Sequence, residues 1–184
     1  MTRKLKLQFS HIAEGFAPEN TDPSKYCDEE FRTFSLANLE DVDCIILGRI
    51  TAEGFIPYWE AVAENPQDPD HLLGKRLTEI PKVVFSKTME ASPWGIATLA
   101  KGELVEEVNK LKNQNGGKIM VYGGDSFVAS LMKHDLIDEY HLGVNPADLE
   151  NGLPILKELE DKPNRTLVQT KTLECGMVVF LQYK

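Results

Sequence analysis

The chain has 184 residues, of which 42% are hydrophobic and 27% are charged. A chain of this length and composition can bury enough apolar surface to fold, which excludes general disorder, and we expect one domain over residues 1–184. The balance of 20 Lys and Arg against 29 Asp and Glu gives a net charge of −9, without a basic cluster that would contact DNA or RNA. No apolar stretch reaches the roughly 18 residues of a membrane span. The first six residues are basic, but Gln8, Ser10, His11 and Glu14 interrupt the apolar core that a signal peptide would need, so we expect no signal peptide and a cytoplasmic protein.

Cysteine and histidine are sparse and scattered. Cys27, Cys44 and Cys175 form no CxxC pair, and the four histidines form no HxxxH or HExxH pattern. We therefore expect no metal, although a site assembled from distant residues stays open. Cys44 lies in the apolar run Asp43 to Leu47, which is typical of a buried cysteine that acts as a small hydrophobic residue.

Strand and helix patterns alternate along most of the chain. In chain order, the expected elements are a strand at 4–9, a helix opening at 28–30, a strand at 42–47, a short helix at 49–55, a strand at 82–85, a helix at 104–111, a strand at 119–122, a helix at 126–132, a strand at 139–144, and two terminal strands at 165–173 and 177–183. This order predicts an α/β fold with three layers, in which helices cover both faces of a mixed, mostly parallel central sheet. The two terminal strands are expected to form an antiparallel hairpin at its edge.

Three of the expected strands end in residues that suit a phosphate group. These residues are Gly48, Arg49 and Thr51 after the strand at 42–47, Ser86, Lys87 and Thr88 after the strand at 82–85, and Gly123, Gly124, Asp125 and Ser126 after the strand at 119–122. Unpaired N–H groups at helix starts bind phosphate oxygens, glycine lets the backbone approach, and cations and hydroxyls add charge and hydrogen bonds. In open α/β sheets such sites gather at the carboxyl ends of the strands. Each segment alone also fits an ordinary turn or a solvated loop, but together they favour phosphate binding.

The sequence resembles the dihydrofolate reductase-like superfamily, specifically single-domain relatives of the reductase half of the riboflavin-pathway deaminase/reductase. The matching segments are Glu14-Gly15-Phe16, Ile45 to Phe55 with Tyr58-Trp59, Lys82 to Thr88 with Trp94, Ile119 to Gly124, Leu136 to Tyr140, and Asn145-Pro146 with Gly152. The resemblance implies NADPH as the cofactor, with Arg49 and Thr51 at its phosphates and Ser86, Lys87 and Thr88 at the adenosine 2′-phosphate. It places the Gly123 to Ser126 turn at the pyrophosphate. A side chain at Gly124 would push the phosphates away and would strain any conformation with positive φ there.

The same resemblance implies where a substrate binds. Glu14 and Phe16 would lie beside the nicotinamide, and Phe31 would line the substrate cleft. Tyr58 and Trp59 would stack on a planar substrate or would simply belong to the core. Glu30 is the candidate proton donor, and the alternative for it is a carboxylate that favours the start of its helix.

The function that we expect is an NADPH-dependent reductase of a small planar heterocycle, pterin- or pyrimidine-like, as in 5-amino-6-(5-phosphoribosylamino)uracil reduction. The alternatives are a non-catalytic NADP(H)-binding module and a true dihydrofolate reductase, whose Trp-x-x-Pro-x-Asp pattern is absent from residues 19–30. We also expect a homodimer, because the apolar run from Met177 to Leu181 would need cover if it lies near a sheet edge.

Overall fold

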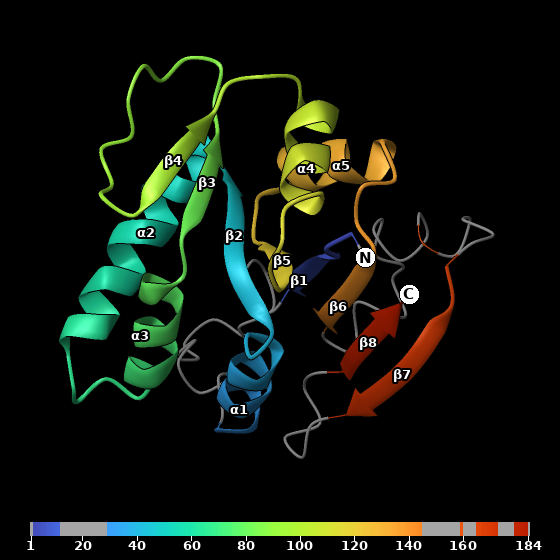
Figure 1. Cartoon of the computed structure of the whole chain (residues 1–184). Helices are drawn as coiled ribbons and strands as arrows, with labels where there is room; N and C mark the ends of the chain where they lie inside the picture. The colour runs from blue at the N-terminus through green and yellow to red at the C-terminus, as the bar shows by residue number, and fades with distance from the viewer. Residues whose placement is uncertain (1, 12–28, 145–158, 160–164, 173–178, 184) are drawn as a thin grey trace. The chain divides into compact units, whose positions relative to one another are not determined.

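The computed structural model describes residues 2–11, 29–144, 159, 165–172 and 179–183 (Figure 1). Contacts divide the chain into two compact units, the first made of residues 1–6 and 32–138 and the second of residues 7–31 and 139–184. The organisation of the whole chain as one domain stays a prediction.

The first unit holds most of the helices and the parallel strands. Its elements are β2 (Val42–Gly48), α2 (Arg49–Glu64), α3 (His71–Glu79), β3 (Lys82–Phe85), β4 (Ala97–Ala100), α4 (Leu104–Lys112), β5 (Lys118–Val121) and α5 (Asp125–Lys133). Two elements cross the boundary between the units: β1 (Leu5–His11) contributes its first two residues to the first unit, and α1 (Glu29–Asn38) contributes its last seven.

The strands of the first unit follow the order β4-β3-β2-β5-β1. Strand β2 pairs in parallel with β3 on one side and with β5 on the other, and β3 pairs in parallel with β4. The chain thus moves outward from β2 to β4 and then returns to the opposite side of β2. Because crossovers between parallel strands are right-handed, this reversal places α2 and α3 on one face of the sheet and α4 and α5 on the other (Figure 1). The predicted parallel α/β architecture is confirmed for this unit.

The hydrophobic core of the first unit lies between the sheet and the pair α2 and α3. It is built from fully buried side chains of β2 such as Ile45 and Leu47, with Ile56 of α2 and Leu77 of α3. Burial of a side chain of this size is worth about 1.5–3 kcal/mol. Cys44 of the same strand is buried, only 7% exposed, as its apolar surroundings predicted. Burial raises the pKa of the Cys44 thiol.

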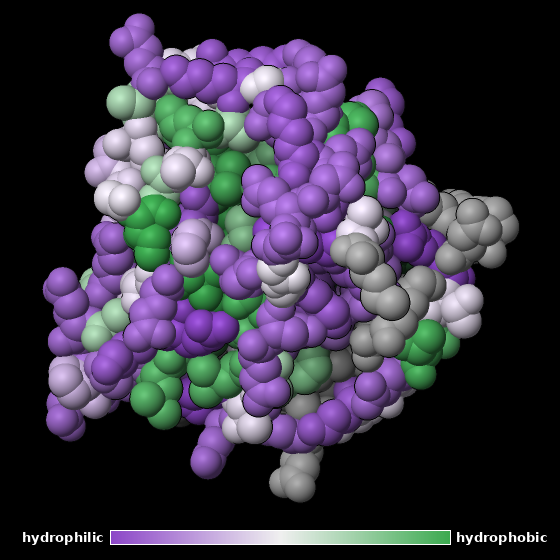
Figure 2. Space-filling model, in the orientation of Figure 1, coloured by the Kyte–Doolittle hydropathy of each residue, from purple (hydrophilic) through white to green (hydrophobic). Residues whose placement is uncertain are grey.

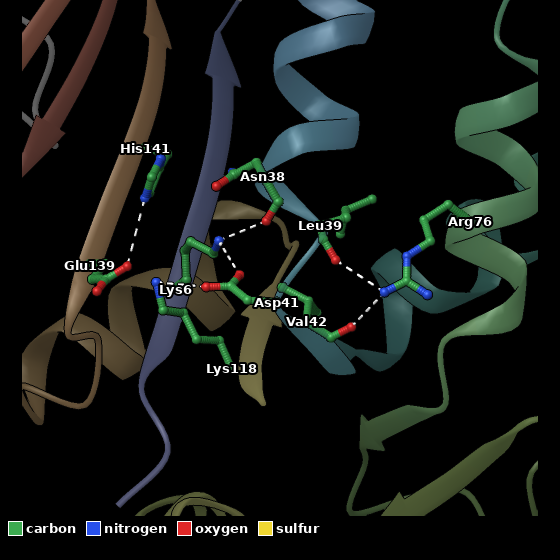
Figure 3. A network of polar contacts seen from close by, with 9 residues as sticks. All are labelled: Lys6, Asn38, Leu39, Asp41, Val42, Arg76, Lys118, Glu139 and His141. Atoms are coloured by element: carbon green, nitrogen blue, oxygen red, sulfur yellow. Dashed lines mark hydrogen bonds and ion pairs between the residues drawn. The ribbon is translucent and has the colours of Figure 1, made fainter. Parts of the chain in front are cut away.

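A polar network fixes the amino end of β2 (Figure 3). The Lys6 ammonium donates to the carbonyl oxygen of Asn38 at 2.7 Å and to the Asp41 carboxylate at 3.0 Å, and Lys118 binds the other oxygen of Asp41 at 2.9 Å. Burial alone would raise the pKa of Asp41, but the hydrogen bonds and charges of Lys118 and Lys6 hold it below its ordinary value. The carboxylate therefore stays ionised and ties the start of β2 to β1 and β5.

Arg76 of α3 binds the connection between α1 and β2 (Figure 3). Its guanidinium donates to the carbonyl oxygens of Leu39 at 3.1 Å and Val42 at 3.0 Å. Of the carbonyl groups that Lys6 and Arg76 bind, that of Asn38 is the last of α1, where positive charge is favourable, and those of Leu39 and Val42 lie between α1 and the start of β2. The amino end of β2 is thus held by the ion pairs of Asp41 and by the hydrogen bonds of Arg76.

The second unit contains the antiparallel strands. Strand β8 (Val179–Tyr183) pairs antiparallel with both β6 (Glu139–Val144) and β7 (Leu167–Thr172). The connection between β7 and β8, residues 173–178, lies outside the described residues, so the turn of the predicted hairpin stays a prediction. Strand β8, which holds the end of the apolar run at Leu181, lies one strand in from the sheet edge, and β7 is the outer strand that covers it. All six residues of β7 are exposed.

Three features of the first unit differ from expectation. Helix α2 continues nine residues beyond the expected end at Phe55, through Pro57, because α2 packs along α3 and the core stabilises it. Helix α3 and strand β4 were not predicted. The short run of β4 has alanines at both ends, so it carries little apolar signal, but it pairs in register with β3 from Lys82↔Ala97 to Phe85↔Ala100.

The surface seen in Figure 2 is mostly hydrophilic, and hydrophobic residues show there in small separate groups. Among the described residues, no helix is both long and apolar enough to cross a membrane. No group of three or more potential metal ligands occurs within the described part of the chain.

Candidate active site

The candidate site lies where the strand order of the first unit reverses. Strand β2 ends at Gly48, directly before α2, and the neighbouring strand β5 ends at Val121, from which residues 122–124 lead to the start of α5 at Asp125. Ligands of open α/β sheets bind at such a switch point, outside the carboxyl ends of the strands.

Two helix N-termini meet here. Gly48 caps α2 and Gly124 caps α5, both in extended conformation and both without a side-chain capping hydrogen bond. The first N–H groups of a helix have no partner within it, and the helix dipole makes this end positive. The junction of β2 and β5 therefore offers two sets of backbone donors to an anion.

A pocket of about 480 Å³ opens at this junction. Its walls come from the ends of β2 and β3 and from the first turns of α2 and α5, and the lining residues are Gly48, Arg49, Ile50, Thr51, Phe85, Ser86, Lys87, Thr88, Gly124, Ser126, Phe127 and Ser130. The structure thus brings together eight of the ten residues that the sequence proposed for a cofactor. The two others are Gly123, in the connection from β5 to α5, and Asp125, the first residue of α5, whose side chain lies outside the described atoms.

Thr51 and Gly124 join the two helix starts. The Gly124 N–H donates to the Thr51 hydroxyl oxygen at 3.0 Å. Gly124 has a φ of −73°, so the positive φ considered for this position does not occur and alanine would not be strained there. A Cβ at Gly124 would meet only the Thr51 hydroxyl within 4 Å, at 3.7 Å. The missing side chain at Gly124 leaves open space at the wall of the pocket.

Phe127 explains two other glycines. A Cβ built on Gly48 would lie 3.3 Å from the Phe127 side chain, and a Cβ on Gly123 would come equally close to its ring. The ring also packs against Phe85, with centroids 5.3 Å apart. Gly48 and Gly123 therefore serve close packing under the pocket. Phe127 was not among the residues predicted from the sequence, although its place as the third residue of the helix after Gly123-Gly124 is a signal that could have identified it.

Each cation of the pocket has a carboxylate partner. Arg49 binds Glu53 at 2.6 Å along α2, and Lys87 binds Glu103 at 3.0 Å. Both pairs are substantially exposed, and surface ion pairs of this kind contribute only about 0–1 kcal/mol. An incoming anion can therefore compete with the carboxylates for both cations.

Ser86 shapes the loop after β3. Its side chain is buried, and its hydroxyl oxygen accepts the N–H groups of Thr88 at 3.2 Å and Met89 at 3.1 Å. This local hydrogen bonding holds the turn that carries Lys87 and Thr88 at the pocket wall.

Tyr122 stands directly before the two glycines. Its ring stacks on Phe55 with centroids 5.1 Å apart. Desolvation by burial raises the pKa of Tyr122 well above its ordinary value, so the phenol stays neutral and adds no negative charge at the junction.

Of the residues that the structure describes, those proposed for the substrate do not line this pocket. Trp59 packs against the hydrophobic core, and the ring of Tyr58, 58% exposed, meets Trp59 edge-on at 5.1 Å. Glu30 and Phe31 belong to the second unit, where the Glu30 carboxylate binds the Lys171 ammonium at 2.6 Å. Glu14 and Phe16 lie outside the described residues.

A family model described as the RibD C-terminal domain matches residues 5–179 of the chain. The chain belongs to this family. Over 182 residues it is 29% identical to YyaP of Bacillus subtilis (strain 168), an uncharacterised protein, with 96% of this chain and 92% of the relative covered. YwjB, a second uncharacterised protein of Bacillus subtilis (strain 168), is 36% identical over 74 residues, which is 40% of this chain and 41% of the relative.

Solved structures share the fold of this RibD C-terminal domain. A putative riboflavin biosynthesis protein of Shewanella sp. PV-4 superimposes with a TM-score of 0.60 at 21% identity, covering 100% of this chain and 98% of that one. A deaminase and 5-amino-6-(5-phosphoribosylamino)uracil reductase of Thermotoga maritima gives 0.59 at 18% identity, with 100% of this chain on 56% of that one. A pyrimidine reductase-like protein of Corynebacterium diphtheriae gives 0.54 at 14% identity, covering 99% and 91%.

Proposed function

We propose that this RibD C-terminal domain is an NADPH-dependent reductase of a small planar heterocycle, pterin- or pyrimidine-like. The observation that carries the proposal is the pocket at the junction of β2 and β5. Two helix N-termini, two cations and several hydroxyls line it, and the rest of its wall is backbone or apolar. That set of donors suits the phosphates of a dinucleotide.

Each side chain has a distinct part in the proposed cofactor site. The first N–H groups of α2 and α5 would bind the pyrophosphate, and Gly124 would let it approach the backbone. Arg49 and Thr51 would contact phosphate oxygens beside the start of α2. Lys87 and Thr88 would hold the adenosine 2′-phosphate, while Ser86 keeps their loop in shape through its bonds to Thr88 and Met89.

The substrate class that we propose rests on the family and on the proteins whose solved structures share the fold. These are described as a riboflavin biosynthesis protein, a phosphoribosylaminouracil reductase and a pyrimidine reductase-like protein. When bound, NADPH supplies a hydride, and the reduced bond then needs a proton from an acid or from water. Glu30 stays our candidate for that acid.

One observation favours a second function, that of an NADP(H)-binding module without turnover. The Glu30 carboxylate is engaged by the Lys171 ammonium at 2.6 Å, which stabilises its ionised form. A reductase that uses Glu30 must break this pair or protonate the carboxylate during the cycle.

The test is a screen for substrate-dependent loss of NADPH absorbance, with dihydrofolate, dihydropterins, pyrimidine intermediates and quinonoid compounds as candidates. A reductase oxidises NADPH with at least one of them. A protein that binds NADPH tightly but oxidises it with none supports the module, and a protein that does not bind NADPH refutes both functions.

A further inference from the structure

The ion pair between Lys87 and Glu103 joins the proposed cofactor pocket to the start of α4. Lys87 follows β3 and Glu103 follows β4, and the two strands run parallel in register up to Phe85↔Ala100. The ladder continues one bond further, because the Ser86 N–H donates to the Ala100 carbonyl at 3.2 Å. The register therefore brings residues 87 and 103 together at the same edge of the sheet. The Lys87 ammonium lies 3.0 Å from the Glu103 carboxylate.

The attraction between Lys87 and Glu103 is weak enough for a ligand to break. Lys87 and Glu103 have side chains 72% and 75% exposed, so water and salt screen their attraction. Lys87 lines the pocket, but Glu103 lies outside its lining and caps α4 without a side-chain capping bond. Replacing the carboxylate therefore removes no side-chain hydrogen bond from the start of α4.

Glu103 acts on the pocket in two ways. It occupies the ammonium that an entering phosphate would use, and its own charge repels that phosphate. A phosphate group at Lys87 must therefore displace Glu103, whereas a cofactor that lacks this phosphate leaves the pair intact.

We propose that Glu103 is a specificity-determining residue, a resident counter-ion that weakens binding of the 2′-phosphorylated cofactor and so sets the preference between NADPH and NADH. This inference rests on the proposed function, in which Lys87 faces the adenosine 2′-phosphate. Glu53, which holds Arg49 within α2, has no such selective effect, because both cofactors carry the pyrophosphate.

The experiment compares Glu103→Gln with Glu106→Gln by calorimetric titration with NADPH and with NADH at low ionic strength. Glu106 is an exposed carboxylate in the first turn of the same helix, and no contact joins it to Lys87, so its substitution is the matched control for net charge. An exposed ion pair corresponds to about a two- to fivefold change in affinity. We expect Glu103→Gln to bind NADPH tighter by this factor, with NADH affinity unchanged and Glu106→Gln close to wild type.

A double-mutant cycle with Lys87→Met assigns the effect to the pair. If Glu103 acts by occupying Lys87, most of the gain from Glu103→Gln disappears in the Lys87→Met background. Equal NADPH affinities for Glu103→Gln and Glu106→Gln, in a protein that binds NADPH, would overturn this inference and leave the proposed function standing. A wild-type protein that binds neither cofactor would overturn the proposed function and this inference with it.

Discussion

Replacing Gly124 by alanine separates a ligand-binding glycine from a structural one. The φ of −73° and ψ of 164° at this position suit alanine, and the new methyl group would meet only the Thr51 hydroxyl, at an ordinary contact distance of 3.7 Å. The free protein should therefore tolerate the change. A phosphate seated against the same backbone would not, because the methyl group would push it away from the N–H groups at the start of α5.

The size of each effect follows from these contacts. Alanine is a poorer helix cap than glycine by less than about 1 kcal/mol, and the lower entropy of the unfolded alanine chain offsets part of this. The thermal midpoint should move by no more than about 2–4 °C. Loss of one hydrogen bond to a charged phosphate costs about 1.5–3 kcal/mol, so NADPH should bind about 10- to 150-fold more weakly.

Two other glycines serve as controls when the NADPH dissociation constant and the thermal midpoint are measured together. Gly54→Ala lies in the interior of α2 with nothing within 4 Å of its Cβ, and it should stabilise the protein by about 0.5–1 kcal/mol without affecting affinity. Gly123→Ala, whose Cβ would lie 3.3 Å from the Phe127 ring, should lower the midpoint instead. A Gly124→Ala protein that folds and binds NADPH like wild type would refute the placement of the phosphates.

Two further predictions concern the fold and the assembly. Desolvation lowers the pKa of the buried Lys82 ammonium to about 8 from 10.5, so the unfolded chain holds this proton up to a higher pH, and the stability of the wild type should rise between those two pH values. In urea unfolding, the Lys82→Met variant should lack this rise. Equal pH profiles of the two proteins would show that the carbonyls of Leu77 and Ile80, which accept from Lys82 at 2.7 and 2.8 Å, keep the pKa of Lys82 near normal. We also predict a homodimer that covers the exposed outer strand β7, so light scattering should give twice the 20.7 kDa of one chain at micromolar concentration, and the monomer mass would contradict it.

The parts of the fold that could be predicted are those with a strong local signal. The buried run of β2 and the glycine after it located the strand, the start of α2 and one wall of the pocket. The same reasoning found β5, α5 and the loop after β3, because each joins an apolar run to residues that favour a turn. Since parallel strands end at one edge of the sheet, three separate segments could be expected at a single site, and the structure brings them together there.

The parts that could not be predicted depend on contacts distant in the sequence. The sequence predicted a short helix that ends at Phe55, but α2 continues through Pro57 because packing against α3 and the core stabilises it. Strand β4 exists because β3 offers it a partner. The roles of Gly48 and Gly123 depend on the ring of Phe127, and the carboxylate that pairs with Lys87 comes from Glu103, beyond the next strand. None of these partners can be identified from the spacing of residues alone.

The central claim is that the pocket at the junction of β2 and β5 binds a 2′-phosphorylated dinucleotide. Calorimetric titration of the wild-type protein with NADPH and NADH tests it most directly. The charge of Lys87 and the hydroxyl of Thr88 predict that NADPH binds at least about tenfold tighter, since one hydrogen bond to a charged group is worth about 1.5–3 kcal/mol. Equal affinities for the two cofactors, or no binding of either, would contradict the account.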